Sequence, residues 1–538
     1  MGLVSHLYDR KDGKFVCKIC KKEYVKSKSG STFSLINHIK KLHPHDYEKA
    51  ELISGRPRKK PLQTLDSPLA GNEQMTESFF EPQKLAEDGE ESSEITRAIT
   101  EMIVIDLMPF STVQKKGFRQ LLSILKPNYR LPSRWSFTRT ELPQLHALIR
   151  ERVQEELDAA EHVVICFDLW SDEGSLHEVF GVFAYFLKEK TVVQRLIGVI
   201  NSREQCPTEV NIANKTKELL DEFGITTKVV AAVRDGASNA VKACDVLPYE
   251  SFDCLNHNIH LAAAEGIKTI IGLSEVLENY KKIVRKLKKS SLDQKGFERI
   301  QEVLEESKLH LTKNSPLRWC HLRDMFVRAL RCKESISILL ERRPDLPQLS
   351  ESDWSLMEST CKLLKPLSDQ SDVQRRGSSA SAVIPICHYL VHVMRNRTDE
   401  PSLAIAERMA SELNKYERTD YLLVSTFLDP QYKERTNPRP KTAAQIDIEL
   451  AARIELDRFL AMPVEVDSNA VDFWTNPLTI SQLPLFSRHA MKYIICPPGS
   501  GEIERVFSTE SCDKLRKSLS VENFEKLLFL SKNLPLMK

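Results

Sequence analysis

The chain has 538 residues, and because single hydrophobic cores stop growing near about 250 to 300 residues, we expect several structural units. Charged residues make up 28% and apolar residues 41%, and the formal net charge is only +2, which indicates a globular chain and excludes a surface that is basic throughout. No apolar run approaches the roughly 20 residues of a membrane span, and the first residues lack the apolar core of a secretory signal. We therefore expect an intracellular protein with no membrane partner.

Residues 1–50 form the first predicted unit, and they contain two pairs of metal-ligand residues. Cys17 and Cys20 form a CxxC pair, and His38 and His43 follow after a gap of 17 residues. Two thiolates and two imidazoles satisfy tetrahedral zinc, so we predict a zinc finger. Three alternatives stay open: His45 could replace His43, the pattern could arise by chance, and the finger could contact protein instead of DNA. The ten other cysteines are scattered singly and are expected to pack in cores.

The predicted finger is a variant, since about 12 residues separate the ligand pairs of an ordinary DNA-reading finger. Its miniature core is predicted to contain Phe15, Tyr24, Phe33 and Leu35. Lysines on the helix that carries the histidines, and in the loop before it, are predicted to contact DNA phosphates. These lysines are Lys26, Lys28, Lys40 and Lys41.

Residues 51–94 are rich in Pro, Gly, Ser and acidic residues, and this composition predicts a disordered linker. The linker contains a short cationic block with Arg58, Lys59 and Lys60. Such a block suits a nuclear import signal or an arm in the DNA minor groove. A solvated run of charge is the alternative.

Residues 95–158 are predicted to be helical. Apolar side chains recur at helical spacing over residues 95–107, and Pro109 ends that helix. Ser111 is expected to cap a second helix that ends before Pro127, and a third helix is expected over residues 141–157.

The pattern then changes to one of strands. Residues 163–167, 179–186, 192–200 and 229–233 are predicted strands, with a helix over residues 210–223, and together they indicate an α/β unit with a mixed sheet. Asp168 and Asp235 follow two of these strands, where carboxylates could hold Mg²⁺ for phosphodiester chemistry. Asp after a strand is also common turn chemistry, so spacing alone leaves this assignment open.

A long helical block follows, because no strand pattern recurs for some 200 residues beyond Leu261. Strand and helix patterns resume near residues 485–495, ahead of Pro497 and a final helical run. The helices predicted in the block span residues 281–289, 297–311, 325–340, 354–367, 380–394 and 404–416.

Several motifs follow the finger in a fixed order. They are Val104-x-x-x-x-Pro109-Phe110-Ser111 continuing to Pro132-Ser133-Arg134, Phe167-Asp168-Leu169-Trp170-Ser171, Arg234-Asp235-Gly236-Ala237-Ser238-Asn239, Cys254-x-x-His257-x-x-x-Leu261, Arg318-Trp319, and Glu504-Arg505-Val506-Phe507-Ser508 with Leu527-Leu528-Phe529-Leu530 behind it. Together with the finger they resemble the hAT superfamily of DNA transposases that carry a BED-type zinc finger, or a domesticated BED-domain protein derived from one. The resemblance covers most of the chain.

The resemblance implies an order of domains. A BED finger over residues 1–50 and the linker over residues 51–94 precede a helical DNA-binding and intertwining segment over residues 95–158. A ribonuclease-H-like core then begins at residues 159–265 and is interrupted by an all-helical insertion over residues 266–470. Residues 471–538 complete the core and include a dimerisation region whose apolar side chains would bury against a second copy.

The resemblance also implies roles for site residues. Asp168, Asp235 and Glu504 would form a triad that binds magnesium or manganese and cuts and rejoins DNA at transposon ends, with no covalent enzyme intermediate. Trp319, with Arg318 beside it, would stack on an unpaired base, although a helix-packing role is the alternative.

Cys254 and His257 would support the active site structurally, although they could also be half of a second zinc site. The family often has Thr where this chain has Cys166 and Arg234, and Arg234 could compete with Mg²⁺ for Asp235 if it pointed inward. The BED pattern has a Trp where this chain has Ser5 or a neighbour.

Two functions therefore remain for this chain. One is a nuclear, homodimeric or higher-order DNA transposase that acts on double-stranded DNA and has no small-molecule substrate. The other is a catalytically inactive, dimeric transcriptional regulator with the same fold.

Overall fold

A computed structural model describes most of the chain. The described residues are 7–11, 14–25, 33–43, 89–171, 178–201, 209–236, 238–312, 319–375, 378–433, 450–464, 469–500 and 519–537. The chain divides into two compact units, Met1–Glu81 and Pro82–Lys538, and each is described by itself. No helix among these residues combines the length and the apolar character that a membrane span requires.

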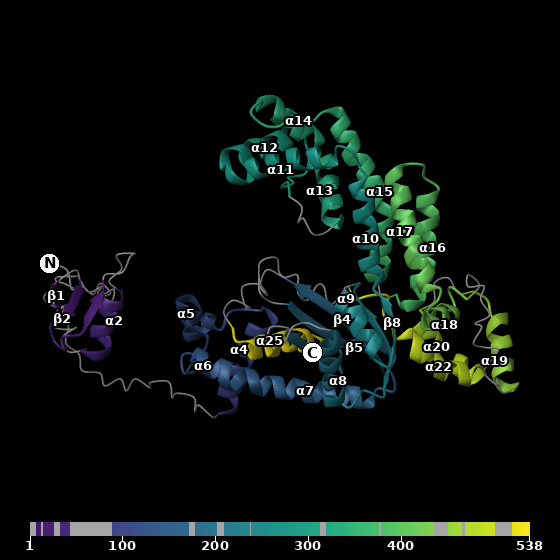
Figure 1. Ribbon diagram of the computed structural model, residues 1–538, viewed down its shortest axis with the longest axis horizontal. Helices are drawn as coiled ribbons and strands as arrows, with labels where there is room; N and C mark the ends of the chain where they lie inside the picture. The colour runs from purple at the N-terminus through teal and green to yellow at the C-terminus, as the bar shows by residue number, and fades with distance from the viewer. Residues whose placement is uncertain are drawn as a thin grey trace, which may run out of the picture. The chain divides into compact units, whose positions relative to one another are not determined.

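The described residues of the first unit form a three-stranded antiparallel sheet and one helix (Figure 1). The buried residues Leu7, Tyr8, Cys17, Leu35 and Ile39 form its core, and Phe15 and Tyr24 pack against them. The elements are β1 (Tyr8–Lys11), β2 (Lys14–Cys17), β3 (Glu23–Val25) and α2 (Phe33–Leu42).

The second unit opens with helices, as predicted, but two boundaries differ. Helix α4 begins at Glu90, because Glu90 and Glu91 supply the acidic first turn that a helix N-terminus favours, so the linker predicted to reach residue 94 ends earlier. Ser111 caps no α-helix and lies in a 3₁₀ turn, and α5 begins after Lys115. The elements are α4 (Glu90–Ile105), η1 (Phe110–Gln114), α5 (Lys116–Leu125), α6 (Arg134–Ser136), the π turn η2 (Phe137–Glu141) and α7 (Leu142–Ala159).

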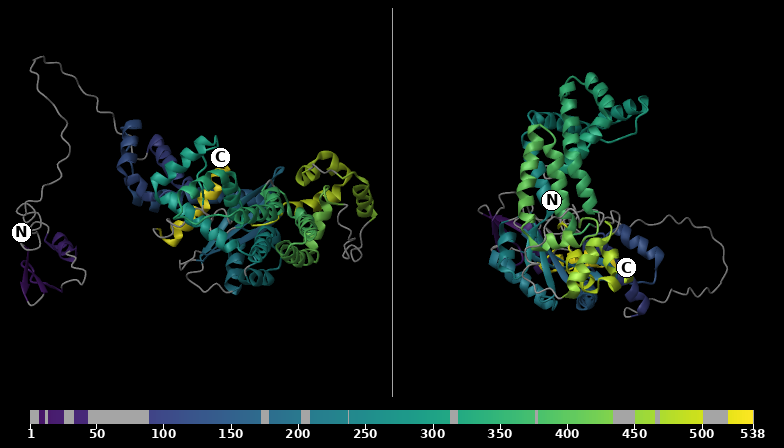
Figure 2. Two further views of the ribbon diagram at one scale, coloured as in Figure 1. Left: turned by 90° about the horizontal axis from the view of Figure 1, so that it is seen from above. Right: turned by 90° about the vertical axis from the view of Figure 1, so that its right-hand side faces the viewer.

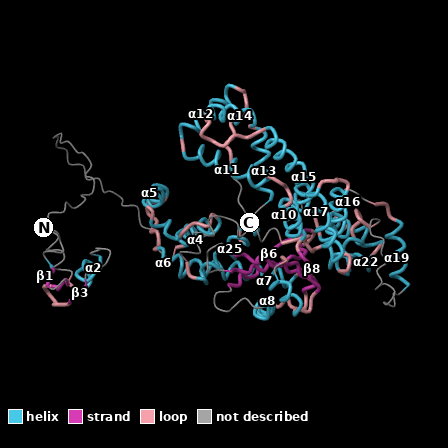
Figure 3. Tube along the Cα trace, turned by 45° about the horizontal axis from the view of Figure 1, so that its top comes forward, coloured by secondary structure: helices cyan, strands magenta, loops and turns pink. Residues whose placement is uncertain are grey.

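A five-stranded mixed sheet forms the centre of the second unit, and its order is β6-β5-β4-β7-β8. β4 pairs antiparallel with β5 and parallel with β7, and β8 continues the parallel side. Figure 3 shows the described strands of this unit gathered in one sheet while helices make up the rest. The strands are β4 (Val163–Ser171), β5 (Glu178–Lys188), β6 (Thr191–Asn201), β7 (Val229–Arg234) and β8 (Glu250–Asp253).

Helix α25 (Val521–Asn533) returns from the far end of the chain to the sheet and packs against β6 and α7. The side-chain amide of Asn533 accepts a hydrogen bond from Leu196 N at 3.1 Å and donates one to Leu196 O at 2.9 Å. Leu527, Leu528 and Leu530 are fully buried by this packing. The chain's own core therefore covers these three side chains, and burial of other apolar residues of this region against a second copy stays a prediction.

The other helices beside the sheet are α8 (Glu209–Glu222) and α9 (Ser238–Val246), which pack on each other. Beyond β8, every regular element among the described residues is helical. Helices α10, α15, α16 and α17 lie alongside one another (Figure 1), and Figure 2 shows them extending from the sheet. Helices α11 to α14 surround a second core of their own. The helices are α10 (Leu255–Lys268), α11 (Leu273–Lys289), α12 (Ser291–Val303), α13 (Trp319–Arg331), α14 (Lys333–Arg342), α15 (Glu351–Arg375), η4 (Ala380–Ala382), α16 (Val383–Arg395), α17 (Glu400–Tyr416), α18 (Asp420–Leu428) and α19 (Leu450–Ala461).

Several predicted elements in this part of the chain have other bounds, and one has another type. The helix predicted over residues 297–311 ends at Val303, and the one predicted over residues 325–340 is two helices that break at Cys332. Residues 485–495, where a strand pattern resumes in the sequence, form a helix that Pro484 begins. The remaining elements are α20 (Ala470–Thr475), α21 (Pro477–Gln482), α22 (Pro484–Ile494) and η6 (Pro535–Met537).

Candidate zinc centre and strand-end carboxylates

The four predicted zinc ligands come from two elements of the finger. Cys17 ends β2 and Cys20 follows in a tight turn, in which Cys17 N donates to Lys22 O and Lys21 N donates to Cys17 O, both at 2.9 Å. His38 lies on α2, and His43 follows its last residue. The turn and the helix thus supply one ligand pair each.

The ligand atoms of these four residues all lie within 4.8 Å of one another. Cys20 Sγ and His38 Nε2 are 3.2 Å apart, and the buried His43 Nε2 has no hydrogen-bond partner among the described residues. Interaction with the His43 ring lowers the pKa of the Cys20 thiol to about 6, toward the thiolate that a metal requires. Two sulfurs and two imidazole nitrogens at this spacing fit structural zinc. His45 lies outside the described residues.

Tyr8 holds the finger's sheet against its helix. Its hydroxyl donates to Leu35 O at 2.9 Å, and its ring meets those of Phe15 and Tyr24 edge to face. Burial raises the pKa of Tyr8. Sequence reasoning left Ile39 out of this core, although its spacing of four from Leu35 on one helix could have revealed it.

Most of the predicted DNA-contact residues cannot be placed in detail. Lys40 and Lys41 lie on α2, but their side chains are not among those described. Trp319 is the first residue of α13 and is 8% exposed within the main core, which favours helix packing over base stacking for its ring. The predicted contacts that lie outside the described residues are Lys26, Lys28, Arg58, Lys59, Lys60 and Arg318.

Asp168 and Asp235 occupy equivalent positions on adjacent parallel strands. Cys166 of β4 pairs with Val233 of β7, and each aspartate stands two residues beyond this pair. Asp235 is 8% exposed, whereas the side chain of Asp168 is not described. Glu504 lies outside the described residues, so the third carboxylate of the expected triad has no position here.

Arg234 does not point at the Asp235 carboxylate as a competing cation, because Asp253 binds it. Arg234 pairs in register with Asp253 of β8, and its guanidinium forms a buried ion pair with the Asp253 carboxylate. The hydroxyl of Tyr416, on α17, donates to Asp253 O at 2.9 Å and links the helical block to this strand end. Sequence reasoning did not identify Asp253, because the short strand that carries it was not predicted.

The motif with Cys254 and His257 connects the strand ends to the last part of the chain. Cys254 Sγ accepts a hydrogen bond from Ser500 N at 3.2 Å, and Leu255 N donates to Pro498 O at 3.1 Å. A Cβ on Gly236, next to Asp235, would lie 3.3 Å from the His257 ring.

These contacts are compatible with the structural support predicted for Cys254 and His257, which stays a prediction. Within the described part of the chain, the finger holds the one group of three or more residues that could bind a metal through His, Cys, Asp or Glu. The alternative role of Cys254 and His257 as half of a second zinc site stays a prediction.

Comparison with protein families matches three segments of the chain. Residues 3–44 match the BED zinc finger, residues 252–363 the ZBED1 RNase-like helical domain, and residues 455–534 the hAT family C-terminal dimerisation region. The second match overlaps the predicted helical insertion, and the third overlaps the predicted dimerisation region.

Curated relatives are similar over long stretches at low identity. Human zinc finger BED domain-containing protein 4 is 25% identical over 605 residues, which cover 97% of this chain and 51% of the relative. Mouse zinc finger BED domain-containing protein 6 is 23% identical over 407 residues, or 69% of this chain and 40% of the relative. Its human counterpart is 23% identical over 373 residues, or 64% and 38%. The chain thus spans about half the length of the first relative and less of the other two.

The finger, the helical match and the carboxy-terminal match occur in the order that the motifs predicted. The chain carries a BED zinc finger and a hAT C-terminal dimerisation region and is homologous to the zinc finger BED domain-containing proteins, as a hAT-derived protein would be.

Proposed function

We propose that this chain is a nuclear, zinc-dependent DNA-binding protein of the hAT transposase type. The observation that carries the proposal is the convergence of Cys17, Cys20, His38 and His43 within 4.8 Å on a BED-type finger. Zinc bound there would fix the short helix against the small sheet, since a core of this size does not hold a fold alone. The fixed helix would then present Lys40 and Lys41 to DNA phosphates.

Nuclear location and self-association complete the proposal. The cationic block with Arg58, Lys59 and Lys60 suits nuclear import. Within the matched dimerisation region, Leu478, Ile480 and Leu485 remain exposed on α21 and α22, so they rather than the buried α25 are available to a second copy. Two fingers in one homodimer would bind double-stranded DNA more tightly than one.

Replacement of one zinc ligand tests the DNA-binding function. We expect Cys17→Ser to lose the bound zinc and to weaken binding of labelled duplex DNA at least about tenfold, because the finger helix would lose its attachment. Zinc content by atomic absorption and DNA affinity by fluorescence anisotropy would measure both effects. Cys361→Ser, in the second unit, is the matched control and should change neither. DNA affinity that survives loss of zinc would contradict the proposal.

DNA cutting and rejoining is the finer proposal, with Asp168, Asp235 and Glu504 as the metal-binding carboxylates. The equivalent positions of Asp168 and Asp235 on parallel strands support it, as does the attachment of Ser500, four residues before Glu504, to Cys254. A mixed sheet followed by helices also suits the proposed ribonuclease-H-like core with an insertion. Bound Mg²⁺ or Mn²⁺ would supply a Lewis acid for attack on a phosphodiester.

A regulator that has lost catalysis is the alternative for the same fold. Incubation of labelled transposon-end DNA with Mg²⁺ or Mn²⁺ separates the two functions. We expect the wild-type chain to cut and Asp235→Asn to lose at least about a hundredfold in rate, since a metal ligand is removed. If the wild-type chain cuts no DNA at any metal concentration, the transposase proposal is wrong and the regulator is the remaining function.

A further inference from the structure

Helix α5 carries apolar side chains that no described part of the chain covers. Its sequence places five apolar residues along one side of the helix, yet none of its ten residues is buried. Phe118 and Leu122 pack in part against the main core, whereas Leu121, Ile124 and Leu125 are 56%, 72% and 64% exposed. The last three residues lie at positions i, i+3 and i+4, so they form one continuous surface, which we call the apolar face of α5.

The surroundings of α5 leave this face open. Figure 1 shows α5 at the edge of the second unit, and η1 is its chief neighbour among the described elements. Single exposed apolar side chains are ordinary on a protein surface, but contiguous ones mark interaction sites. Most helical stability in proteins comes from packing of an apolar face, so a binding partner would supply what α5 lacks.

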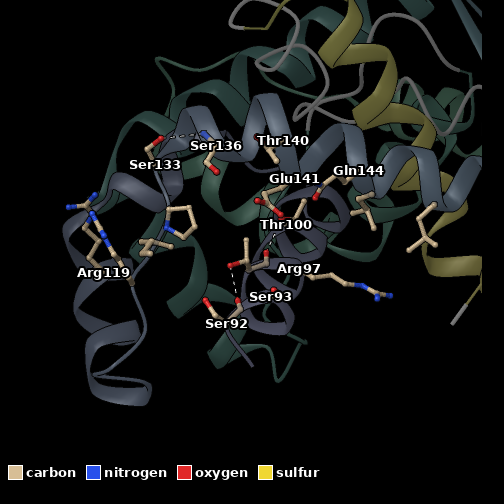
Figure 4. Close-up of a pocket in the computed structure, with 16 residues that line it drawn as sticks. Ser92, Ser93, Arg97, Thr100, Arg119, Ser133, Ser136, Thr140, Glu141 and Gln144 are labelled. Atoms are coloured by element: carbon tan, nitrogen blue, oxygen red, sulfur yellow. Dashed lines mark hydrogen bonds between the residues drawn. The ribbon is translucent and has the colours of Figure 1, made fainter. Parts of the chain in front are cut away.

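The charges around the apolar face define the partner. Residues 107–140, which include α5, contain seven Lys or Arg and no Asp or Glu. Lys115, Lys116 and Arg119 have no acidic partner among the described residues. Figure 4 shows the Arg119 guanidinium turned outward, away from the hydroxyl side chains of the cavity between α4 and α7. These cations are therefore available to a negatively charged partner.

The start of α5 adds to this preference for negative charge. Lys115 is the N-cap residue and supplies no side-chain hydrogen bond, and the first turn contains no acidic residue. The first N–H groups of a helix and the positive end of its dipole favour an anion, but here Lys115 and Lys116 stand beside them. A carboxylate from a partner would relieve this repulsion and accept hydrogen bonds from the free N–H groups.

From these observations, we propose that the apolar face of α5 docks an acidic amphipathic helix of another protein. The apolar side chains of that helix cover the face, while its carboxylates meet the unpaired cations around the start of α5. Segments that combine acidic and apolar residues in this way occur in transcriptional activation domains. The inference is independent of the DNA-binding function proposed above.

Three other occupants fit the face less well. A second copy of α5 would bring more cations and no acid, so the two helices would repel each other. DNA phosphates would neutralise the cations but would leave the apolar face in water. An anionic lipid surface would cover both, and it is therefore a separate outcome of the experiment.

Binding of a synthetic helix to the full chain tests the proposal. The probe is a fluorescein-labelled peptide of about 15 residues, with Leu at positions i, i+3, i+4 and i+7 and Glu and Ala elsewhere. A basic control peptide has Lys in place of every Glu. We expect the acidic probe to bind at least about tenfold more tightly than the basic one, and its affinity to fall as salt rises. Fluorescence anisotropy measures both.

Substitutions on α5 then locate the bound probe. Leu121→Ser/Leu125→Ser should weaken binding of the acidic probe at least about tenfold, because two side chains lose their cover. Lys116→Glu should weaken it about threefold and reduce its dependence on salt. Leu292→Ser is the matched control, because Leu292 is a 79% exposed leucine on α12, and this variant should bind as the wild type does. All the substituted residues are exposed, so each variant should keep the stability of the wild type in thermal denaturation.

Two results with the probe would overturn the proposal. One is equal binding of the acidic and the basic peptide, and the other is equal binding of the acidic peptide by Leu121→Ser/Leu125→Ser and Leu292→Ser. Sedimentation velocity, sedimentation with phosphatidylserine vesicles and binding of a labelled duplex are measured on the same variants. If the leucine variant loses self-association, vesicle binding or DNA affinity while the acidic probe binds no variant, the face belongs to that other occupant and the proposal is wrong.

Discussion

The finger and the strand-end carboxylates are both candidate metal sites, but they depend on the fold in different ways. Every ligand of the finger lies between Cys17 and His43, and one turn and one helix bring the four together. The carboxylates lie at Asp168, Asp235 and Glu504, so only a complete sheet and the return of the last segment could join them. A site whose ligands are close in sequence is therefore readable from spacing, whereas a distant site needs contacts between whole elements.

The two sites also differ in what holds them. The core of the finger is a handful of residues around Tyr8, so binding of zinc and folding of the finger would be one process. Asp235 instead extends from a sheet whose strands are buried in a large core that exists whether or not a metal is bound. Next to Asp235 on this strand end, Arg234 is already paired with a protein carboxylate, that of Asp253.

Removal of Asp253 is the change that would disturb the strand-end site most. Asp253→Ala would leave the Arg234 guanidinium buried without its partner, and we expect it to reduce the free energy of unfolding by about 3 to 5 kcal/mol. The two side chains are 10% and 18% exposed, so solvent would replace the lost carboxylate only in part. Chemical denaturation followed by tryptophan fluorescence would measure the change.

The double variant Arg234→Ala/Asp253→Ala separates loss of the pair from loss of packing. It should be more stable than Asp253→Ala alone, because no buried charge remains without a partner. If Asp253→Ala alone has a free energy of unfolding within about 1 kcal/mol of the wild type, Arg234 must have another partner. The claim that this ion pair holds the strand-end site would then be wrong.

Sequence reasoning succeeded where the pattern was local. Four of the five strands of the mixed sheet and most helices were predicted, because buried strands and amphipathic helices carry their own periodicity. Strand β8 was missed, since Glu250–Asp253 at the edge of the sheet is four residues long and contains one apolar residue, Phe252. The break at Cys332 was missed because apolar spacing continues across it.

The candidate sites show the same contrast between local patterns, which could be predicted, and contacts between distant residues, which could not. The finger ligands converge as their spacing predicted, and their assignment needed no contact beyond one helix and one turn. The partner of Arg234 and the contact of Cys254 with Ser500 could not be predicted, because strand pairing and a separation of 246 residues bring them together. Nor could the sequence tell which apolar residues of the last segment pack within the chain, as those of α25 do, because apolar character does not reveal which surface covers it.

A substitution with a smaller expected effect, Gly499→Ala, tests whether the segment that leads toward Glu504 is held against Cys254. A Cβ on Gly499 would lie 2.6 Å from Cys254 Sγ, so Gly499→Ala must displace either the cysteine or the backbone that leads toward Glu504. We expect a loss of about 1 to 3 kcal/mol in the free energy of unfolding, as for other overpacked sites.

Gly296→Ala is the matched control, because its Cβ would meet nothing within 4 Å. Gly296 lies inside α12, where alanine should stabilise by up to about 1 kcal/mol. Cys254→Ala should recover part of the loss by removing the sulfur. Equal stability of the two glycine variants would mean that residue 499 does not lie against Cys254. The proposal that Glu504 reaches the strand ends would then lose its support.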